Sequence, residues 1–440
     1  MKSARRSARP GETEWCSAAR LEADWKVLCR DIGERRAGTA GEKSAADYIV
    51  AELQRAGVKE AQLEPFPCLS LREGRAEVLE RRGSKWVGVE ATPVVGAPAT
   101  PGWVQGELAW LELPEQTNRL KRGSLRGKIL ALFGPMPTEL EGHRRLLAAD
   151  PLAIIHVDER LPFTWTKNDG VYPYWAREHG MLPTLTVPYL EAWRWKRQGV
   201  SKLRVRVRVR QEETTSYNVI GELPGTDPRL PALAVSAHHD TQCGNPGADD
   251  NASGVLCVLA LARALAGRRH RRTLRFYSFG TEEQLSVGAT AHVRNTGLTP
   301  RQVGLLINFD SVASPLGHLQ MLIAGPRELE QAAASALASA QAEVAVQREV
   351  TPFGDVFPFN RVGIPSLWFM RSNFPGGRWQ HHSPHDTLEN VSTDEVQRLL
   401  RAAAPLIRQW AQAERWPFPS RLPAAQRRQA EQLGRELLGW

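Results

Sequence analysis

Near the middle of the chain, the pattern of hydrophobic and polar positions predicts a buried strand, a polar loop and a helix in succession. The apolar run at residues 233–237 is short and follows Pro231, as is typical of a strand in a covered sheet. The apolar run at 255–265 is long enough for a helix, and Gly267 is expected to end it. Between the two runs lie His238, Asp240, Asp249 and Asp250.

Three further apolar runs repeat this arrangement of a strand followed by polar residues. They span residues 272–279, 303–309 and 363–370. Ligands of an open sheet covered by helices bind beyond the carboxyl ends of its strands. We therefore expect one edge of one sheet to gather the polar side chains that follow the four strands. These are His238, Asp240, Asp250, Glu282, Glu283, Asp310 and His382.

The remaining segments predict helices around this sheet and a second, β-rich region. Helical periodicity dominates between Trp15 and Gly57, whereas short β-like runs alternate with Gly and Pro between Pro65 and Gly199. The predicted fold class is α/β, a mixed and mostly parallel sheet covered by helices on both faces, with a β-rich inserted domain. The predicted units are a solvated basic tail at 1–14, a main domain at 15–65 and 210–413, the insert at 66–209, and a C-terminal helical tail at 414–440.

Residues 203–210, LRVRVRVR, form the clearest amphipathic strand of the chain, with Arg on one face and Val on the other. A ribbon that binds nucleic acid is one interpretation of the Arg face, but a solvated strand face is favoured over it. The net charge of +9 is moderate and favours solubility without indicating a nucleic-acid partner. We expect no nucleic acid among the partners.

The cysteines are odd in number and scattered along the chain, with no closely spaced pair among the five. This pattern argues against a disulfide framework and fits a reducing compartment. The basic N-terminus is not followed by the apolar segment of a secretory signal, and no apolar run is long enough to span a membrane. We therefore expect a cytoplasmic protein without a membrane partner.

Several short motifs carry a family resemblance. They are His-x-Asp at 238–240, GADDNASG at 247–254, Glu-Glu at 282–283, Asn-Phe-Asp at 308–310 and HSPHDT at 382–387. In this order they resemble the co-catalytic di-zinc aminopeptidases. Residues 34–57 resemble the opening segment and first helix of that family, and residues 125–158 resemble the protease-associated domain that is often inserted in it. The resemblance therefore covers most of the chain and implies a zinc-peptidase fold.

The resemblance also implies a set of metal ligands. His238 and Asp310 would hold one metal ion, Glu283 and His382 would hold the other, and Asp250 would bridge both. The implied cofactor is two Zn²⁺ ions per chain, although carboxylate-rich pairs also accept Co²⁺ or Mn²⁺. The residue types agree with this, because two His and three carboxylates without Cys suit a hydrolytic zinc pair better than a closed structural site.

Two acidic residues are assigned to the chemistry itself. By the resemblance, Glu282 would be the general base, since a carboxylate beside a metal-activated water can take its proton and pass it to the leaving amine. Adjacent residues diverge, so Glu282 is not expected to ligate the same ion as Glu283. Asp240 would either fix the tautomer of His238 through the second ring nitrogen or act as a ligand itself.

Other polar residues near the motifs allow two interpretations each. Asp249 and Asp250 could simply cap the following helix, where carboxylates suit the positive end of the dipole. Asp355 lies in a stretch, TPFGDVFPFN, that resembles the Ser-Asp-His segment of the family, but Val356 replaces the His. Asp355 is therefore either an acid that supports the site or a turn residue beside Gly354.

The remaining histidines are expected to be structural. Strand alternation points His239 away from His238, and we expect no metal role for His381, where relatives often carry Tyr, or for His385. Cys243 is interpreted as a loop filler and not as a zinc ligand. Proximity alone suggests that Arg371, Phe374 and Trp379 line a substrate pocket.

The function predicted from the resemblance is metal-dependent removal of N-terminal residues from peptides. Three alternatives stay open: a glutaminyl cyclase, which shares the fold but uses one zinc ion, a carboxypeptidase, and a binding module without catalysis. The complete set of five ligands favours an enzyme, but it does not show which end of the peptide is held. A peptide substrate is the expected partner, and a homodimer is possible.

Overall fold

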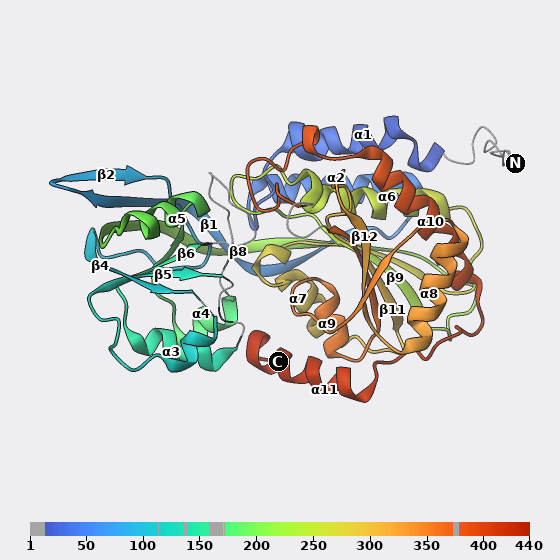
Figure 1. The fold of residues 1–440 in the computed structure, drawn as a ribbon. Coiled ribbons are helices and arrows are strands. Elements are labelled where there is room, and N and C mark those ends of the chain that lie inside the picture. Colours follow the sequence, from blue (N-terminus) through green and yellow to red (C-terminus); the bar gives the residue numbers. More distant parts are fainter. Residues whose placement is uncertain are drawn as a thin grey trace, which may run out of the picture.

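The computed structural model describes residues 14–112, 114–134, 137, 139–157, 170, 172–372 and 378–440. The predicted basic tail at 1–14 therefore lies almost wholly outside the described residues. The chain forms a large lobe and a small lobe that lie side by side (Figure 1). The large lobe contains the beginning and the second half of the chain, and the small lobe is built from the residues between them.

A single sheet passes through both lobes. Its long strands β1 (Gln62–Arg82) and β8 (Lys202–Leu223) pair antiparallel, from Gln62 opposite Ile220 to Glu80 opposite Leu203. The strand order is β13-β12-β14-β11-β9-β10-β8-β4-β5-β6-β7-β3, and β1 pairs with β8 and β2 outside this path. The remaining strands of the large lobe are β9 (Ala232–His238), β10 (Leu274–Phe279), β11 (Val303–Phe309), β12 (His318–Ala324), β13 (Ala345–Arg348) and β14 (Ser366–Ser372).

The four predicted motif-bearing strands are neighbours in this sheet. Strands β10, β9, β11 and β14 run parallel to one another, and every residue of β9 and β11 is buried. This confirms the predicted mixed, mostly parallel sheet. The fourth strand begins at Ser366, later than the predicted 363, because Gly363 adopts a φ of +89° in the turn that precedes it.

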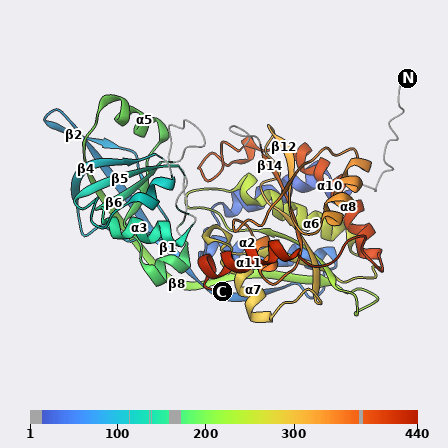
Figure 2. The same cartoon turned by 60° about the horizontal axis from the view of Figure 1, so that its bottom comes forward.

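Helices cover both faces of the large-lobe sheet (Figures 1 and 2). One face packs against α1 (Ala18–Lys26), α2 (Ala40–Ala56), α6 (Gly254–Leu265), α8 (Arg327–Ser339) and α10 (Thr393–Gln412). The other face packs against α7 (Val287–Thr296) and α9 (Val356–Arg361). Helix α6 is apolar on all sides and almost entirely buried, as expected of a helix between a sheet and a second helical layer.

The small lobe has its own parallel strands and its own two-sided core. Its strands are β2 (Lys85–Val89), β3 (Thr92–Pro93), β4 (Val104–Leu111), β5 (Lys128–Phe133), β6 (Ala153–Val157) and β7 (Thr184–Thr186). Helices α5 (Tyr189–Gln198) and α3 (Leu140–Ala149) belong to two separate hydrophobic clusters of this sheet. The insert boundaries at 66 and 209, and its likeness to a protease-associated domain, stay predictions.

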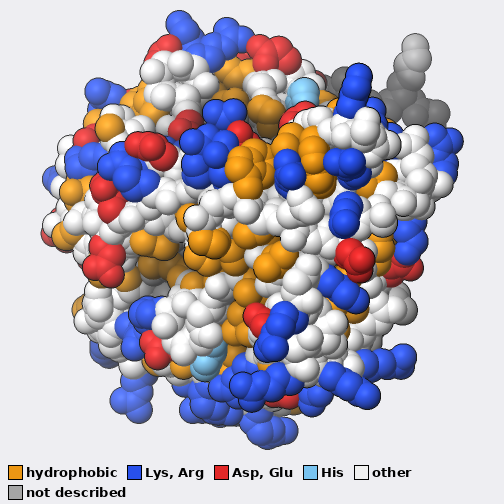
Figure 3. All heavy atoms as spheres, turned by 90° about the vertical axis from the view of Figure 1, so that its left-hand side faces the viewer, with side chains coloured by type: hydrophobic (Ala, Val, Ile, Leu, Met, Phe, Trp, Pro, Cys, Tyr) orange, Lys and Arg blue, Asp and Glu red, His pale blue; other side chains and the backbone are white. Residues whose placement is uncertain are grey.

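The alternating segment 203–210 lies at the start of β8. Val205 and Val207 are fully buried, whereas Arg204 and Arg206 stay partly exposed and stack on Trp86 and Trp103. The strand has neighbours on both sides, because β1 pairs along it and β4 and β10 pair with its two ends. Viewed from the end of the small lobe, Lys and Arg side chains lie scattered among hydrophobic ones (Figure 3).

The C-terminal segment connects the two lobes. Helix α11 (Ala424–Leu433) is followed by a π-helical turn, Gly434–Leu438, beside helix α4 (Pro173–His179) of the small lobe. The buried Trp175 of α4 donates from Nε1 to the carbonyl of Glu436 over 2.5 Å. Among the described residues, we find no helix with the length and apolar character needed to cross a membrane.

Candidate metal centre

The predicted metal ligands follow the ends of neighbouring strands. His238 is the last residue of β9, and Asp310 directly follows β11. Glu283 lies in a short 3-10 turn after β10, and His382 lies in the loop after β14. Asp250 belongs to the segment that leads into α6. Because these strands are parallel neighbours, their carboxyl ends bring residues that are far apart in the sequence to one edge.

The five side chains form two groups that share Asp250. On one side, His238 Nε2 lies 3.1 Å from Asp250 Oδ1 and 3.7 Å from Asp310 Oδ1. On the other side, His382 Nε2 lies 3.5 Å from Asp250 Oδ2 and 3.0 Å from Glu283 Oε2. Asp250 thus lies between two His–carboxylate pairs, with Oδ1 near His238 and Oδ2 near His382.

This donor set fits zinc. Two tetrahedral ligands that each lie about 2.0–2.1 Å from one zinc ion are about 3.3 Å apart, close to the separations seen here. Glu283 Oε1 is buried and has no hydrogen-bond partner. Three buried carboxylates at such short distances repel one another unless a cation lies between them. His238, Asp250 and Asp310 also offer ligand atoms that all lie within 4.8 Å of one another.

Glu282 lies at the edge of this cluster. Its Oε2 atom is 3.9 Å from His238 Nε2, and its side chain keeps an exposed fraction of 14%. Burial raises the pKa of Glu282 well above its usual range, and the neighbouring carboxyl groups of Asp355 and Asp310 raise it further. A raised pKa makes a carboxyl group a better proton acceptor, as a general base requires.

Asp240 holds the turn that carries the two glutamates. Its Oδ1 and Oδ2 atoms accept hydrogen bonds from the backbone N–H groups of Glu282 (2.9 Å) and Glu283 (3.2 Å). Oδ1 also lies 3.5 Å from His238 Nδ1, on the side of the ring opposite to the cluster. Of the two predicted roles for Asp240, the geometry favours the orienting one.

The start of α6 is not capped by the carboxylates that could have done so. Asn251 Oδ1 accepts from the N–H of Gly254, and the Asp249 carboxylate accepts from the N–H of Ala313 (2.8 Å). Asp386 accepts from the N–H groups of both Asp249 (2.7 Å) and Asp250 (2.9 Å). Sequence analysis missed the roles of Asn251 and Asp386, although both lie inside the quoted motifs.

His381 lies in the cluster, contrary to the expectation that it plays a purely structural part. Its Nδ1 atom is 2.6 Å from Asp250 Oδ2, and its ring stacks on His382 with a centroid distance of 3.7 Å. Asp250, His381 and His382 form a second group that could hold a metal ion. Arg378, which the sequence did not single out, contacts Asp250 Oδ2 at 3.3 Å and Ser311 Oγ at 2.6 Å.

The structure bears on the expectations for His239 and Asp355. His239 points away from the cluster, as predicted: Nδ1 lies 3.0 Å from Ser278 Oγ, and burial lowers the pKa of this imidazole to about 4. Asp355 is buried, and this burial raises the pKa of its carboxyl group well above the usual range. It influences the charge of Glu282, so the reading as an acid beside the site is favoured over a turn residue.

The proposed pocket residues and Cys243 are distributed differently. Arg371 donates to the carbonyls of Ser314 and Gly317 and pairs with Glu395, so it braces the scaffold and does not line a pocket. Phe374 lies outside the described residues, and Trp379 contacts the ring of His385. Cys243 accepts from Arg36, in keeping with a structural loop residue.

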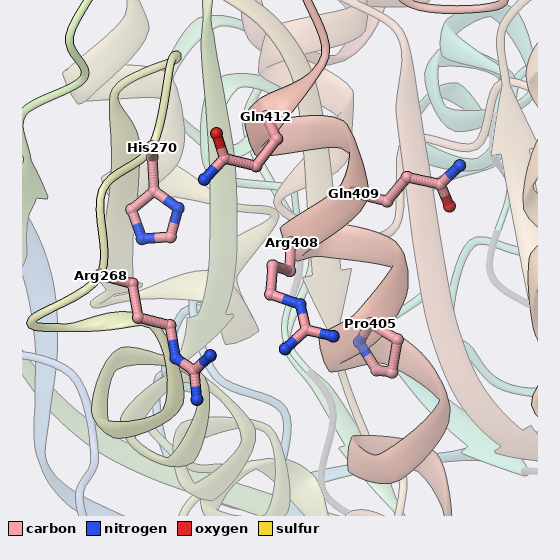
Figure 4. A pocket seen from close by; sticks show the side chains of 6 residues that line it. All are labelled: Arg268, His270, Pro405, Arg408, Gln409 and Gln412. Atoms are coloured by element: carbon pink, nitrogen blue, oxygen red, sulfur yellow. The ribbon is translucent and has the colours of Figure 1, made fainter.

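A separate basic groove lies at the other end of the strands, between the turn before β10 and helix α10. It encloses about 500 Å³ and is lined by Arg268, His270, Pro405, Arg408, Gln409 and Gln412 (Figure 4). No carboxylate is among these lining residues. The groove contains none of the predicted ligands, so it is not part of the metal cluster.

Comparisons with known proteins agree with the geometry. Residues 218–407 match the model of peptidase family M28. An aminopeptidase of Pseudomonas aeruginosa is 32% identical over 319 residues, which cover 67% of this chain and 57% of that protein. The leupeptin-inactivating enzyme 1 of Streptomyces exfoliatus is 27% identical over 47% of this chain and 50% of its own length. The chain thus spans 57% of the first relative's length and half of the second's.

Solved structures share the fold across nearly the whole chain. A peptidase M28 precursor from Shewanella amazonensis superposes with a TM-score of 0.76 at 19% identity, covering 94% of this chain and 97% of the other. A zinc aminopeptidase from Bacillus subtilis gives a TM-score of 0.72 at 18% identity, covering 92% and 98%. The chain thus matches peptidase family M28 over residues 218–407, and it shares the fold of these solved structures over nearly its whole length.

Proposed function

We propose that this protein is a zinc aminopeptidase that removes N-terminal residues from peptides with two zinc ions and Glu282 as general base. The observation that carries the proposal is the position of Asp250 between two His–carboxylate pairs, His238 with Asp310 and His382 with Glu283. The family match and the relatives named as aminopeptidases support the peptidase activity. One zinc ion would be held by His238, Asp250 and Asp310, and the other by Asp250, Glu283 and His382.

The side chains of the cluster divide the work of hydrolysis. Bound zinc would polarise the scissile carbonyl and lower the pKa of a water molecule to about 7. Glu282, beside His238 but outside both ligand groups, takes the proton of the attacking water and returns it to the leaving amine. Asp240 keeps Glu282 and Glu283 in place through their backbone N–H groups.

The alternative reactions differ in what they need from the site. A glutaminyl cyclase would use one zinc ion, and the two ligand groups around Asp250 speak against it. A carboxypeptidase would use the same ligands, so substrate testing has to separate the two peptidases. We also infer a reducing, cytoplasmic location, because none of the five cysteines, which all lie among the described residues, forms a disulfide. A homodimer stays a prediction.

The experiment is an assay of the zinc-loaded protein with three kinds of substrate. We expect hydrolysis of aminoacyl anilides with a free α-amine, and no hydrolysis of the same compounds after N-acetylation. Release of the C-terminal residue from N-acylated peptides would instead identify a carboxypeptidase. Ammonia release from peptides with N-terminal Gln would identify a glutaminyl cyclase. No turnover with any of them would contradict an enzymatic function.

A further inference from the structure

Arg35 is fully buried, and the described residues provide no carboxylate to pair with it. Its guanidinium donates only to backbone carbonyls. Nε donates to His239 (2.8 Å), Nη2 to Gly247 (2.9 Å), and Nη1 to Leu28 (3.1 Å), Gly33 (3.0 Å) and Pro246 (2.6 Å). All three nitrogens of the group are therefore used, and every acceptor belongs to the main chain.

Three of these carbonyls belong to the loop that joins His238 to Asp250. The carbonyl of His239 follows the first ligand directly, and those of Pro246 and Gly247 close the loop shortly before Asp250. The guanidinium is planar and presents its N–H groups in a fixed fork. One rigid group thus sets the distance between the two ends of the ligand-bearing loop.

The loop has little freedom to move around this contact. A Cβ atom on Gly247 would lie 2.9 Å from Arg35 Nη2 and 2.4 Å from a side-chain atom of Thr241. Trp25 Nε1 donates to the carbonyl of Ala248 over 2.8 Å. The carboxylate of Asp386 holds the next two backbone N–H groups, as described above. The main chain before Asp250 is therefore fixed through its carbonyls from one side and through its N–H groups from the other.

The charge of Arg35 is not needed to fill space. Burying a guanidinium without a carboxylate is unfavourable, and a well-packed apolar side chain would fill such a site at lower cost. What an apolar side chain cannot do is align carbonyls from two ends of a loop. Arg35 also lies outside residues 218–407, about two hundred residues before the loop carbonyls that it contacts.

We propose that Arg35 is a positioning residue of the metal centre, which holds the loop between His238 and Asp250 in its zinc-binding shape before zinc binds. The inference rests on the proposed zinc site. Ligands that are ordered in advance bind more tightly, because less conformational entropy is lost on binding. Outer residues that orient metal ligands commonly change metal affinity by about 10–100-fold.

The test is the zinc affinity of the metal-free protein, measured by competition with a chromogenic chelator. We expect Arg35→Met to weaken zinc binding at least tenfold. Arg35→Lys keeps the positive charge but not the planar guanidinium. Its zinc affinity should therefore lie between that of the wild type and that of Arg35→Met. The unfolding midpoint is recorded for each protein to separate affinity from stability.

Arg263→Met is the matched control. The side chain of Arg263 is only 10% exposed, but it pairs with the carboxylates of Asp24 and Glu52 on the helices, away from the loop. We expect this variant to lose stability and to keep wild-type zinc affinity. Wild-type zinc affinity in both Arg35 variants would overturn the inference, as would an equal loss in Arg263→Met. If Arg35→Met fails to fold, Arg35→Lys alone decides in the same way.

The proposed function fails under a different result. A wild-type protein that binds no zinc would contradict the metal centre itself, whatever the Arg35 variants do. A wild-type protein that binds zinc as tightly as both Arg35 variants would leave the proposed function standing and remove only the positioning role.

Discussion

The small lobe and the metal-centre edge of the large lobe show two ways in which this chain uses charged residues. In the small lobe, Arg204 and Arg206 lie on a partly exposed face, where Arg206 pairs with Glu77 and stacks on Trp103. In the large lobe, the carboxylates that follow the strand ends lie buried beside one another and beside histidines. Exposed charges cost little, whereas buried ones are expensive, so the buried set marks the place where chemistry has been selected.

The largest expected effect concerns the buried carboxylates of the large lobe. Glu282→Gln removes the proton acceptor but keeps the shape of the side chain, so we expect kcat to fall by about 10²–10⁴-fold. Zinc content should stay at the wild-type level, because Glu282 lies outside both ligand groups. Steady-state kinetics and elemental analysis of the same sample check both points. An active variant would mean that another group takes the proton.

A second prediction concerns pH and the buried Glu42. Burial raises the pKa of this carboxyl group to about 8, and the charge of Asp240 adds to the rise. A raised folded-state pKa stabilises the protein fully below pH 4.5, and this contribution is lost as the pH rises to 8. Glu42→Gln cannot ionise, so its stability relative to wild type should increase from pH 5 to pH 8 by at most about 4 kcal/mol.

Urea unfolding of the metal-free proteins at the two pH values measures this difference. The Glu42 carboxylate accepts hydrogen bonds from Ser216 Oγ (2.6 Å) and from the N–H of Gly38 (2.6 Å). A Gln side chain can preserve only part of this pair of hydrogen bonds. A constant offset between the two proteins is therefore expected on top of the pH-dependent part. A difference in stability that does not change with pH would show that Glu42 titrates normally.

The small lobe supplies a third prediction through two tryptophans. Trp175 is 1% exposed and contacts the C-terminal segment, whereas Trp193 is 53% exposed on α5. We expect Trp175→Ala to cost about 3–5 kcal/mol and Trp193→Ala to stay within about 0.5 kcal/mol of wild type. Thermal unfolding and limited proteolysis should show the loss in the first variant only. Equal effects would mean that the C-terminal contact does not join the lobes.

The smallest expected effect belongs to the exposed end of β8. Arg206→Gln removes a partly exposed ion pair, so the unfolding midpoint should shift by less than about 2 °C. Aminopeptidase activity should be unchanged, because Arg206 lies in the small lobe and contacts none of the cluster. A large loss of stability would show that the exposed charges of β8 matter as much as the buried ones.

Those parts of the fold with a periodic signal could be predicted from the sequence. The runs predicted at 233–237 and 303–309 correspond closely to β9 and β11. The polar residues that follow these strands lie at one edge of the sheet. The place of each ligand follows from this edge, since parallel neighbours share their carboxyl ends. Hydrophobic patterns were thus sufficient to gather the cluster.

The contacts that support the cluster carry no such signal. Arg35 and Asp386 act on the backbone of a loop far away in the sequence, and neither a spacing nor a periodicity records this. No metal role was expected for His381, where relatives often carry Tyr, yet its ring stacks on His382 and its Nδ1 lies 2.6 Å from Asp250 Oδ2. Irregular loops of this kind have no alternation on which a prediction could rest.

The most direct test of the central claim is a zinc titration of the metal-free protein, followed by calorimetry, for the wild type and Asp250→Ala. We predict that the wild type binds two zinc ions per chain and that Asp250→Ala loses high-affinity binding at both positions, because Asp250 is shared by the two groups. Two zinc ions bound to Asp250→Ala with wild-type affinity would contradict the account.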